Sequence, residues 1–110
     1  MTTTVQKQVL IKARALIADP DHWTRNVLAR NAAGYSVHWC DPAATKWCAV
    51  GVIYRSAYEL VGSKQEGARI GKEVAKRVAP IWFCRSLMTL NDVRGHAAVL
   101  ARFDRALAAA

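Results

Sequence analysis

The sequence lacks the features that identify several common classes of protein. Only 3 of its 110 residues are cysteines, and no Cys-x-x-Cys or His-x-x-x-His motif is present. Disulfide frameworks and structural zinc sites need such spacings, so we expect reduced thiols in a cytoplasmic protein with no metal or other cofactor. No apolar run reaches the roughly 18 residues of a membrane span, and the N-terminus lacks the pattern of a signal peptide. We therefore expect a soluble protein that does not associate with membranes.

Acidic residues are also scarce. The chain has 8 acidic and 16 basic residues, which gives a net charge of +8. Such a charge permits an acidic partner or nucleic acid. The basic residues are spread along the whole chain, however, and this spread favours an ordinary basic surface on a soluble protein.

Apolar residues, by contrast, make up 53% of the chain. A chain this short supports one hydrophobic core, because either half alone would bury too little surface. We therefore expect a single domain over residues 1–110.

The stretch 41–62 predicts a buried central helix around which the rest of the chain is organised. Asp41 and Pro42 suit the N-cap and first position of a helix, and Gly62 suits its left-handed end. Apolar side chains occur on nearly every side between them, which is typical of a helix enclosed by other elements. Gly51, inside this helix, indicates either the close approach of another backbone segment or the mouth of a small pocket.

The other expected elements follow from capping, turn and periodicity signals. In chain order they are a helix from Thr3 or Thr4 to about residue 18, a β-hairpin at about 23–40 with its turn at 31–34, a helix at 63–79, a second buried helix at 81–90, a turn at 91–95 and a last helix at 96–109. The predicted fold class is mainly α, a compact bundle of about five helices with one small β-hairpin.

Three motifs in this order resemble a small family of bacteria and phages that is catalogued only as a domain of unknown function. In that family D-x-x-A-x-x-W-C-x-x-G lies in the centre, an N-D pair precedes the last helix, and the last helix ends in F-D-x-A. The matching residues, with a leucine of the first helix and a tryptophan after a proline, are Leu16, Pro20, Trp23, Asp41, Ala44, Trp47, Cys48, Gly51, Asn91, Asp92, Phe103, Asp104 and Ala106. The chain departs from the family at Val52 and at Gly95-His96, where alanine and threonine are frequent. The resemblance implies the helical architecture over nearly the whole chain and implies no activity.

Cys48 is the first candidate for chemistry. A nucleophilic thiolate needs a helix N-terminus or a neighbouring base to lower its pKa. His96 as base, with Asp92 or Asn91 as its orienting partner, would complete such a site. In the predicted helix, however, Cys48 lies about two turns from the N-terminus, where the helix dipole has little effect. A cysteine-dependent or small-molecule enzyme is therefore an alternative, beside a buried cysteine that acts as a small apolar side chain.

Arg55 is the candidate for ligand binding, because a buried arginine is rarely left unpaired. In one interpretation Asp92 or Asp104 pairs with it and the role is structural. In the other its guanidinium binds an anion in a small cleft, with Cys48 at the rim. The residues expected at that cleft are Arg55, Gly51, Asn91 and Trp47.

Four basic residues share one face of the predicted helix 63–79, and they are Arg69, Lys72, Lys76 and Arg77. They would suit phosphate contacts, but Glu66 and Glu73 dilute their charge and no aromatic residues alternate with them. Association with nucleic acid is therefore a second alternative. The leading hypothesis is a small binding or protein-interaction module. Its four tryptophans and two phenylalanines would also suit an apolar patch on the surface of a homodimer.

Overall fold

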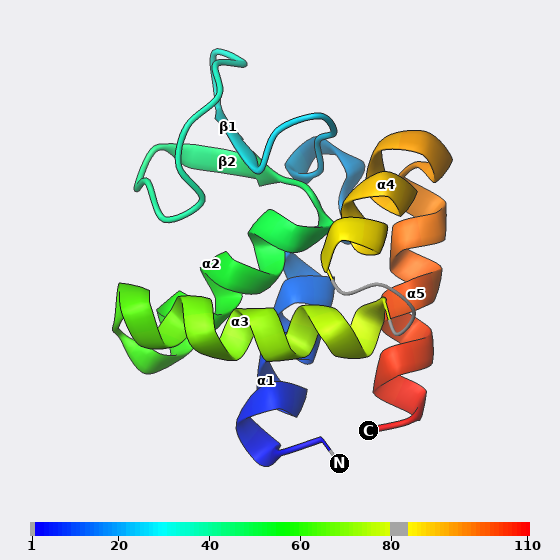
Figure 1. Ribbon diagram of the computed structural model, residues 1–110. Coiled ribbons are helices and arrows are strands. Elements are labelled where there is room, and N and C mark those ends of the chain that lie inside the picture. The colour runs from blue at the N-terminus through cyan, green and yellow to red at the C-terminus, as the bar shows by residue number, and fades with distance from the viewer. Residues whose placement is uncertain (1, 80–83) are drawn as a thin grey trace.

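The computed structural model describes residues 2–79 and 84–110. Within these ranges the chain forms five α-helices and one two-stranded antiparallel sheet (Figure 1). This confirms the predicted fold class. The elements, in chain order, are α1 (Thr4–Leu16), the short 3-10 helix η1 (Pro20–His22), β1 (Ala29–Asn31), β2 (Ala44–Trp47), α2 (Ala49–Val61), α3 (Lys64–Val78), α4 (Cys84–Arg94) and α5 (His96–Ala108).

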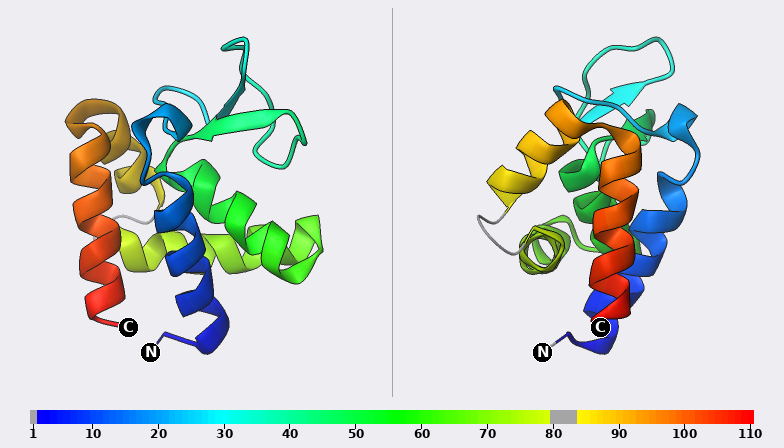
Figure 2. Two further views of the ribbon diagram at one scale, coloured as in Figure 1. Left: turned by 180° about the vertical axis from the view of Figure 1, so that it is seen from behind. Right: turned by 90° about the vertical axis from the view of Figure 1, so that its right-hand side faces the viewer.

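The helices lie below the sheet in a crossed arrangement. α1 and α5 lie side by side and run in opposite directions, so both ends of the chain lie at the same end of the molecule (Figure 2). α3 crosses this pair, and α2 packs against α3. The sheet lies at the opposite end, where β2 leads directly into α2 (Figure 1).

Two helices begin where their capping signals predict. The Thr3 side chain accepts a hydrogen bond from Gln6 N, and the Gln6 side chain accepts one from Thr3 N, which is a complete capping box at the start of α1. At the start of α3, Ser63 Oγ accepts from Glu66 N at 3.2 Å. Such bonds satisfy backbone donors that have no partner inside the first turn.

The central helix begins later than the sequence predicts. α2 starts at Ala49, whereas Asp41 and Pro42 form a turn. Asp41 Oδ1 accepts from Ala43 N at 2.8 Å, and its carbonyl accepts from Ala44 N at 3.0 Å. An aspartate followed by proline suits such a turn as well as it suits a helix start, so these two residues cannot distinguish the two structures.

The end of α2 agrees with the prediction. Gly62 has a φ of 70° and stops the helix in the left-handed conformation. The first five residues of α2, 49–53, are buried, as expected of a central helix, while Glu59 and Leu60 near its end are exposed. The helix is therefore central at its N-terminal half and reaches the surface at the other.

The observed sheet agrees with the predicted hairpin at 23–40 only in part. Its first strand, β1, lies inside that range, and its second strand, β2, lies after it. β1 pairs with β2 through Ala29–Trp47 and Arg30–Lys46, so the sequence prediction of helix over 44–47 is wrong. The expected turn at 31–34 is present, and the segment after it forms an isolated bridge to β1. A β-branched and an aromatic residue in T-K-W favour the extended form that this segment takes.

α4 extends further than predicted, because Asn91 and Asp92 belong to the helix and not to a turn. Gly95, at φ 90°, separates it from α5. The predicted burial of this helix on all sides is wrong, since Leu87 is buried but Met88 is 42% exposed. The predictions for 80–83, a helix break followed by the start of a buried helix, lie outside the described residues.

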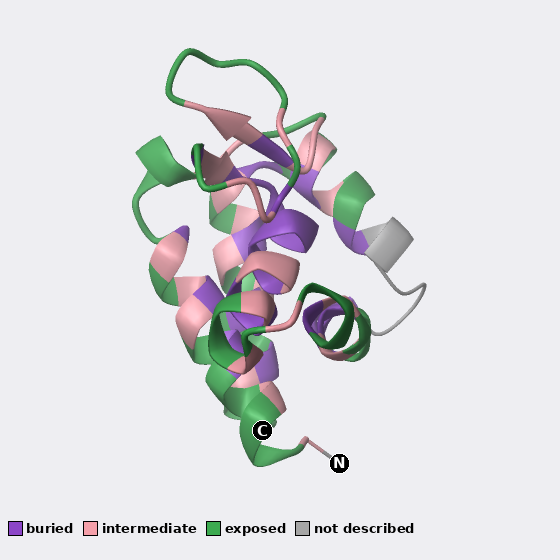
Figure 3. Cartoon of the chain, turned by 90° about the vertical axis from the view of Figure 1, so that its left-hand side faces the viewer, coloured by how far each residue is buried: buried purple, intermediate pink, exposed green. Residues whose placement is uncertain are grey.

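One core unites the helices and the sheet. Buried side chains gather where the helices face one another below the sheet, and much of the loop between the strands is exposed (Figure 3). The five α-helices and both strands contribute to this core. Examples are Val9 of α1, Ala29 of β1, Trp47 of β2, Val52 of α2, Val74 of α3, Leu87 of α4 and Phe103 of α5. None of the described helices combines the length and apolar character needed to cross a membrane.

Candidate functional site

Asn91 connects three segments through one amide group. Its side chain is fully buried. Oδ1 accepts hydrogen bonds from Trp23 Nε1 at 2.7 Å and Ala49 N at 2.9 Å, and Nδ2 donates to Thr24 O at 3.1 Å and Asp92 Oδ1 at 3.0 Å. These four bonds use the two donors and both acceptor positions of the amide. Asn91 therefore joins α4 to the start of α2 and to residues 23–24, and it offers nothing further to a ligand.

Cys48 is the N-cap of α2 and does not lie two turns inside a helix. Its sulfur accepts a hydrogen bond from Gly51 N at 3.3 Å, and the residue is 3% exposed. Burial raises the pKa of the Cys48 thiol above its ordinary value of 9.0, since the hydrogen bond from Gly51 lowers it less, and the charge of Asp92 adds to the increase. The thiol is therefore protonated at neutral pH, unlike an activated nucleophile.

Cys48 and Asp92 both line a small cavity of about 180 Å³ beside residues 26–28. The structure thus brings together two of the three residues proposed for a cysteine site. His96 is engaged elsewhere, because its Nε2 hydrogen-bonds to the carbonyl of Ile17. A raised thiol pKa and an imidazole committed to another partner weigh against cysteine catalysis.

Gly51 allows a close approach of two backbone segments, which confirms one of the two interpretations of this glycine. A Cβ atom at Gly51 would lie 2.0 Å from the carbonyl oxygen of Leu28. That carbonyl accepts a hydrogen bond from Cys48 N at 3.2 Å. The space beside Gly51 is therefore filled by the chain and forms no cleft there.

Arg55 pairs with Glu59, one turn further along α2, and not with Asp92 or Asp104. Asp104 instead pairs with Arg14 at 2.9 Å and joins α5 to α1. The structural interpretation of Arg55 is supported, although both suggested partners are wrong. A partner four residues away on the same helix is a common arrangement that the sequence already offered.

The rest of the Arg55 guanidinium holds the loop before β2. Its Nη1 donates to Asp41 O at 2.8 Å and Trp39 O at 3.3 Å, and its Cζ lies 5.4 Å from the centre of the Trp47 ring. Trp47 Nε1 also donates to Trp39 O, at 3.4 Å. Arg55 and Trp47 are thus occupied by the chain itself.

The basic face of α3 is partly neutralised. Arg69 pairs with Glu66 at 2.8 Å, and Lys76 pairs with Glu73 at 3.3 Å, while Lys72 is exposed. Two of the four cations proposed for phosphate contacts are therefore already matched by carboxylates. This weakens the nucleic-acid alternative.

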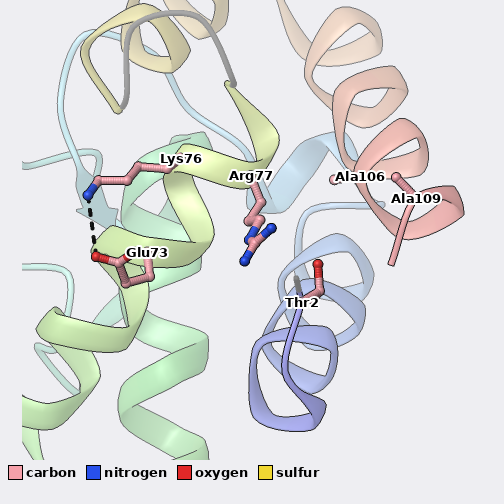
Figure 4. Close-up of a pocket in the computed structure, with 6 residues that line it drawn as sticks. All are labelled: Thr2, Glu73, Lys76, Arg77, Ala106 and Ala109. Carbon is pink, nitrogen blue, oxygen red and sulfur yellow. Dashed lines mark hydrogen bonds and ion pairs between the residues drawn. The ribbon is translucent and has the colours of Figure 1, made fainter.

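A larger hollow lies between α3, the first residues of the chain and the end of α5 (Figure 4). We call this hollow the Arg77 furrow. Its volume is about 420 Å³, and it is lined by Thr2, Glu73, Lys76, Arg77, Ala106 and Ala109. Figure 4 shows the guanidinium of Arg77 directed toward Thr2, whereas Lys76 turns away to its ion pair with Glu73. The sequence marks Arg77 as basic but gives no signal for the furrow, because its walls come from three distant segments.

No group of three or more His, Cys, Asp or Glu side chains in the described part of the chain is arranged to hold a metal ion. Of the two hollows, the one beside Arg77 is larger than the cavity beside the Cys48 thiol.

The sequence profile of DUF6197, a family of unknown function, matches residues 1–109. The chain belongs to DUF6197. No curated protein and no solved structure matches this DUF6197 chain. Membership confirms the resemblance inferred from the motifs and leaves the role of the DUF6197 fold to be argued from its geometry.

Proposed function

We propose that this DUF6197 protein is a binding module for a small molecule that carries an anionic group, and that the Arg77 furrow is its site. The observation that carries the proposal is the guanidinium of Arg77 at the wall of a hollow of about 420 Å³ (Figure 4). Small-molecule sites commonly measure ~300–1,000 Å³. The furrow is thus of a suitable size for a metabolite.

The chemistry of the lining suits a carboxylate or a phosphate. Guanidinium presents its N–H groups in a planar fork that can meet two oxygens of one anion. Arg77 also has an interaction within the chain, but five N–H groups allow it to serve more than one acceptor. The Thr2 hydroxyl is a second donor, and the small side chains of Ala106 and Ala109 leave room between helices.

The state of the candidate side chains supports a binding role better than it supports the alternative of an enzyme. The residues proposed for catalysis are buried, protonated or hydrogen-bonded to the chain, as Cys48, Asn91 and His96 show. In contrast, the Arg77 furrow is a hollow of about 420 Å³ with a guanidinium and a hydroxyl group among its lining residues. The proposal therefore keeps the leading hypothesis, a binding module, and moves its site from Arg55 to Arg77.

The test is an NMR titration of the whole protein with sodium phosphate and with sodium acetate at constant ionic strength. We expect amide shifts concentrated at Thr2, Arg77, Ala106 and Ala109, with a dissociation constant in the millimolar range for such small probes. Arg77→Gln should abolish these shifts. Lys72→Gln removes the same charge from an exposed position of α3 and should leave them unchanged.

Scattered shifts over the whole surface, or equal shifts in Arg77→Gln and the wild type, would show a general response to anions and reject the proposal. The amide spectrum of Arg77→Gln outside the furrow shows at the same time whether the variant is folded.

A further inference from the structure

We propose that the ligand of the Arg77 furrow is amphiphilic: a carboxylate or phosphate at Arg77 with an unbranched apolar chain of roughly eight carbons that lies along α3. This inference rests on the proposed function and adds the class of the ligand. Its basis is a second hollow that adjoins the first.

The second hollow lies next to the furrow, toward the start of α3. It has a volume of about 350 Å³ and is lined by Thr3, Val5, Gln6, Val61, Arg69, Ile70 and Glu73. Glu73 lines both hollows, and the neighbouring residues Thr2 and Thr3 line one each. The two hollows therefore adjoin along one side of α3.

The two ends differ in chemistry. Val5, Val61 and Ile70 supply aliphatic walls at one end, and Val5 is 40% exposed although it is apolar. At the other end Arg77 supplies the cation. Arg69, the cation that lines the apolar end, is already paired with Glu66.

The length of the site sets the length of the ligand. Ile70 and Arg77 are seven residues apart on α3, which corresponds to roughly 10 Å along the helix axis. An extended chain advances about 3.5 Å for every three bonds, so eight to ten bonds cover this separation. Together the two hollows remain within the size range of small-molecule sites and are too small for a protein partner.

The experiment compares the affinities of acetate, butanoate, hexanoate, octanoate and decanoate for the whole protein, below the concentrations at which they self-associate. We expect each methylene between butanoate and octanoate to strengthen binding by up to about fourfold, with no further gain at decanoate. Val5→Ser should flatten this dependence on chain length. Ile11→Ser is the matched control and should keep the dependence, because Ile11 is also an exposed apolar residue of α1 but lines neither of the two hollows.

The outcomes separate this inference from the proposed function. Acetate binding at Arg77 without any dependence on chain length would overturn the amphiphilic ligand and leave the anion site standing. Failure of acetate and of phosphate to bind at Arg77 would overturn the proposed function itself.

A sedimentation assay with vesicles of phosphatidylcholine and phosphatidylglycerol distinguishes a free amphiphile from bilayer lipid. Protein that stays in the supernatant and binds octanoate supports the inference. Protein that pellets with the vesicles, in the wild type and in Val5→Ser alike, would overturn it.

Discussion

Asn91 joins the sheet end of the molecule to the helices α2 and α4. Its amide is fully buried and makes four hydrogen bonds, to Trp23, Thr24, Ala49 and Asp92. In Asn91→Ala the backbone groups of Thr24 and Ala49 and the indole N–H lose their partner in a place with little water. We expect the free energy of unfolding to fall by about 3 kcal/mol in urea denaturation.

Asn31→Ala is the matched control for this variant. Asn31 Oδ1 accepts one hydrogen bond, from Tyr35 N at 3.0 Å, in an exposed turn. Its loss should cost about 1 kcal/mol or less. Equal effects of the two substitutions would mean that the Asn91 network does not hold the segments together.

Cys48 provides a test of the remaining enzyme hypothesis at the same scale. Burial raises the pKa of its thiol above 9.0, so the thiolate forms only at a higher pH than in a free cysteine. In a Cys40→Ser, Cys84→Ser background we expect iodoacetamide to label native Cys48 very slowly at pH 7. The rate should approach that of an ordinary thiol only after unfolding in urea. Rapid labelling of the native protein at pH 7 would restore cysteine catalysis as a serious alternative.

Glu59 joins two helices, because it binds Lys12 of α1 at 3.1 Å and Arg55 of α2. Burial raises the pKa of Glu59, but the hydrogen bonds and charges of Arg55 and Lys12 outweigh it and hold the pKa below its ordinary 4.5. The carboxylate therefore contributes stability at pH values above 4.5, and this contribution is lost as the pH falls through the lowered pKa. In urea denaturation at pH 7, Glu59→Gln should lose up to about 1 kcal/mol, and its difference from the wild type should shrink at pH 3.

Glu66→Gln tests whether the effect comes from joining two helices. Glu66 pairs with Arg69 inside α3, and its pKa is also lowered, by the hydrogen bond and charge of that arginine. Its pair connects no separate elements and is exposed, so the change in stability should be smaller at both pH values. A difference for Glu59→Gln that stays constant between pH 7 and pH 3 would contradict the electrostatic account.

Helices with clear caps are the elements that the sequence predicts well. Thr3 and Ser63 mark the starts of α1 and α3, and Gly62 marks the end of α2, because each cap satisfies its own turn without help from distant residues. The start of α2 and the end of α4 depend on tertiary contacts instead. Asn91 and Asp92 favour a turn locally, yet contacts with Trp23, Thr24 and Ala49 hold them in α4.

The candidate site could be predicted only in part for the same reason. The motif residues Cys48 and Asp92 do line one cavity, but the role of each follows from burial, which a sequence pattern does not state. The Arg77 furrow combines residues near positions 2, 77 and 106 that meet because α1 and α5 run antiparallel across α3. The spacing of residues in the sequence gives no indication that these three segments lie together.

For the whole molecule we expect one cooperative unfolding transition, as the single-domain prediction requires. Trp39 and Trp47 of the sheet end belong to the same core as Val9 of α1 and Phe103 of α5, so neither end can lose its packing alone. In a Trp82→Phe background tryptophan fluorescence reports the sheet end, where Trp23, Trp39 and Trp47 lie, and far-ultraviolet circular dichroism reports the helices. Their urea midpoints should coincide, and separated midpoints would indicate two units.

Repeating the measurement over a hundredfold range of protein concentration tests the predicted homodimer, because the midpoint of a dimer rises with concentration and that of a monomer does not.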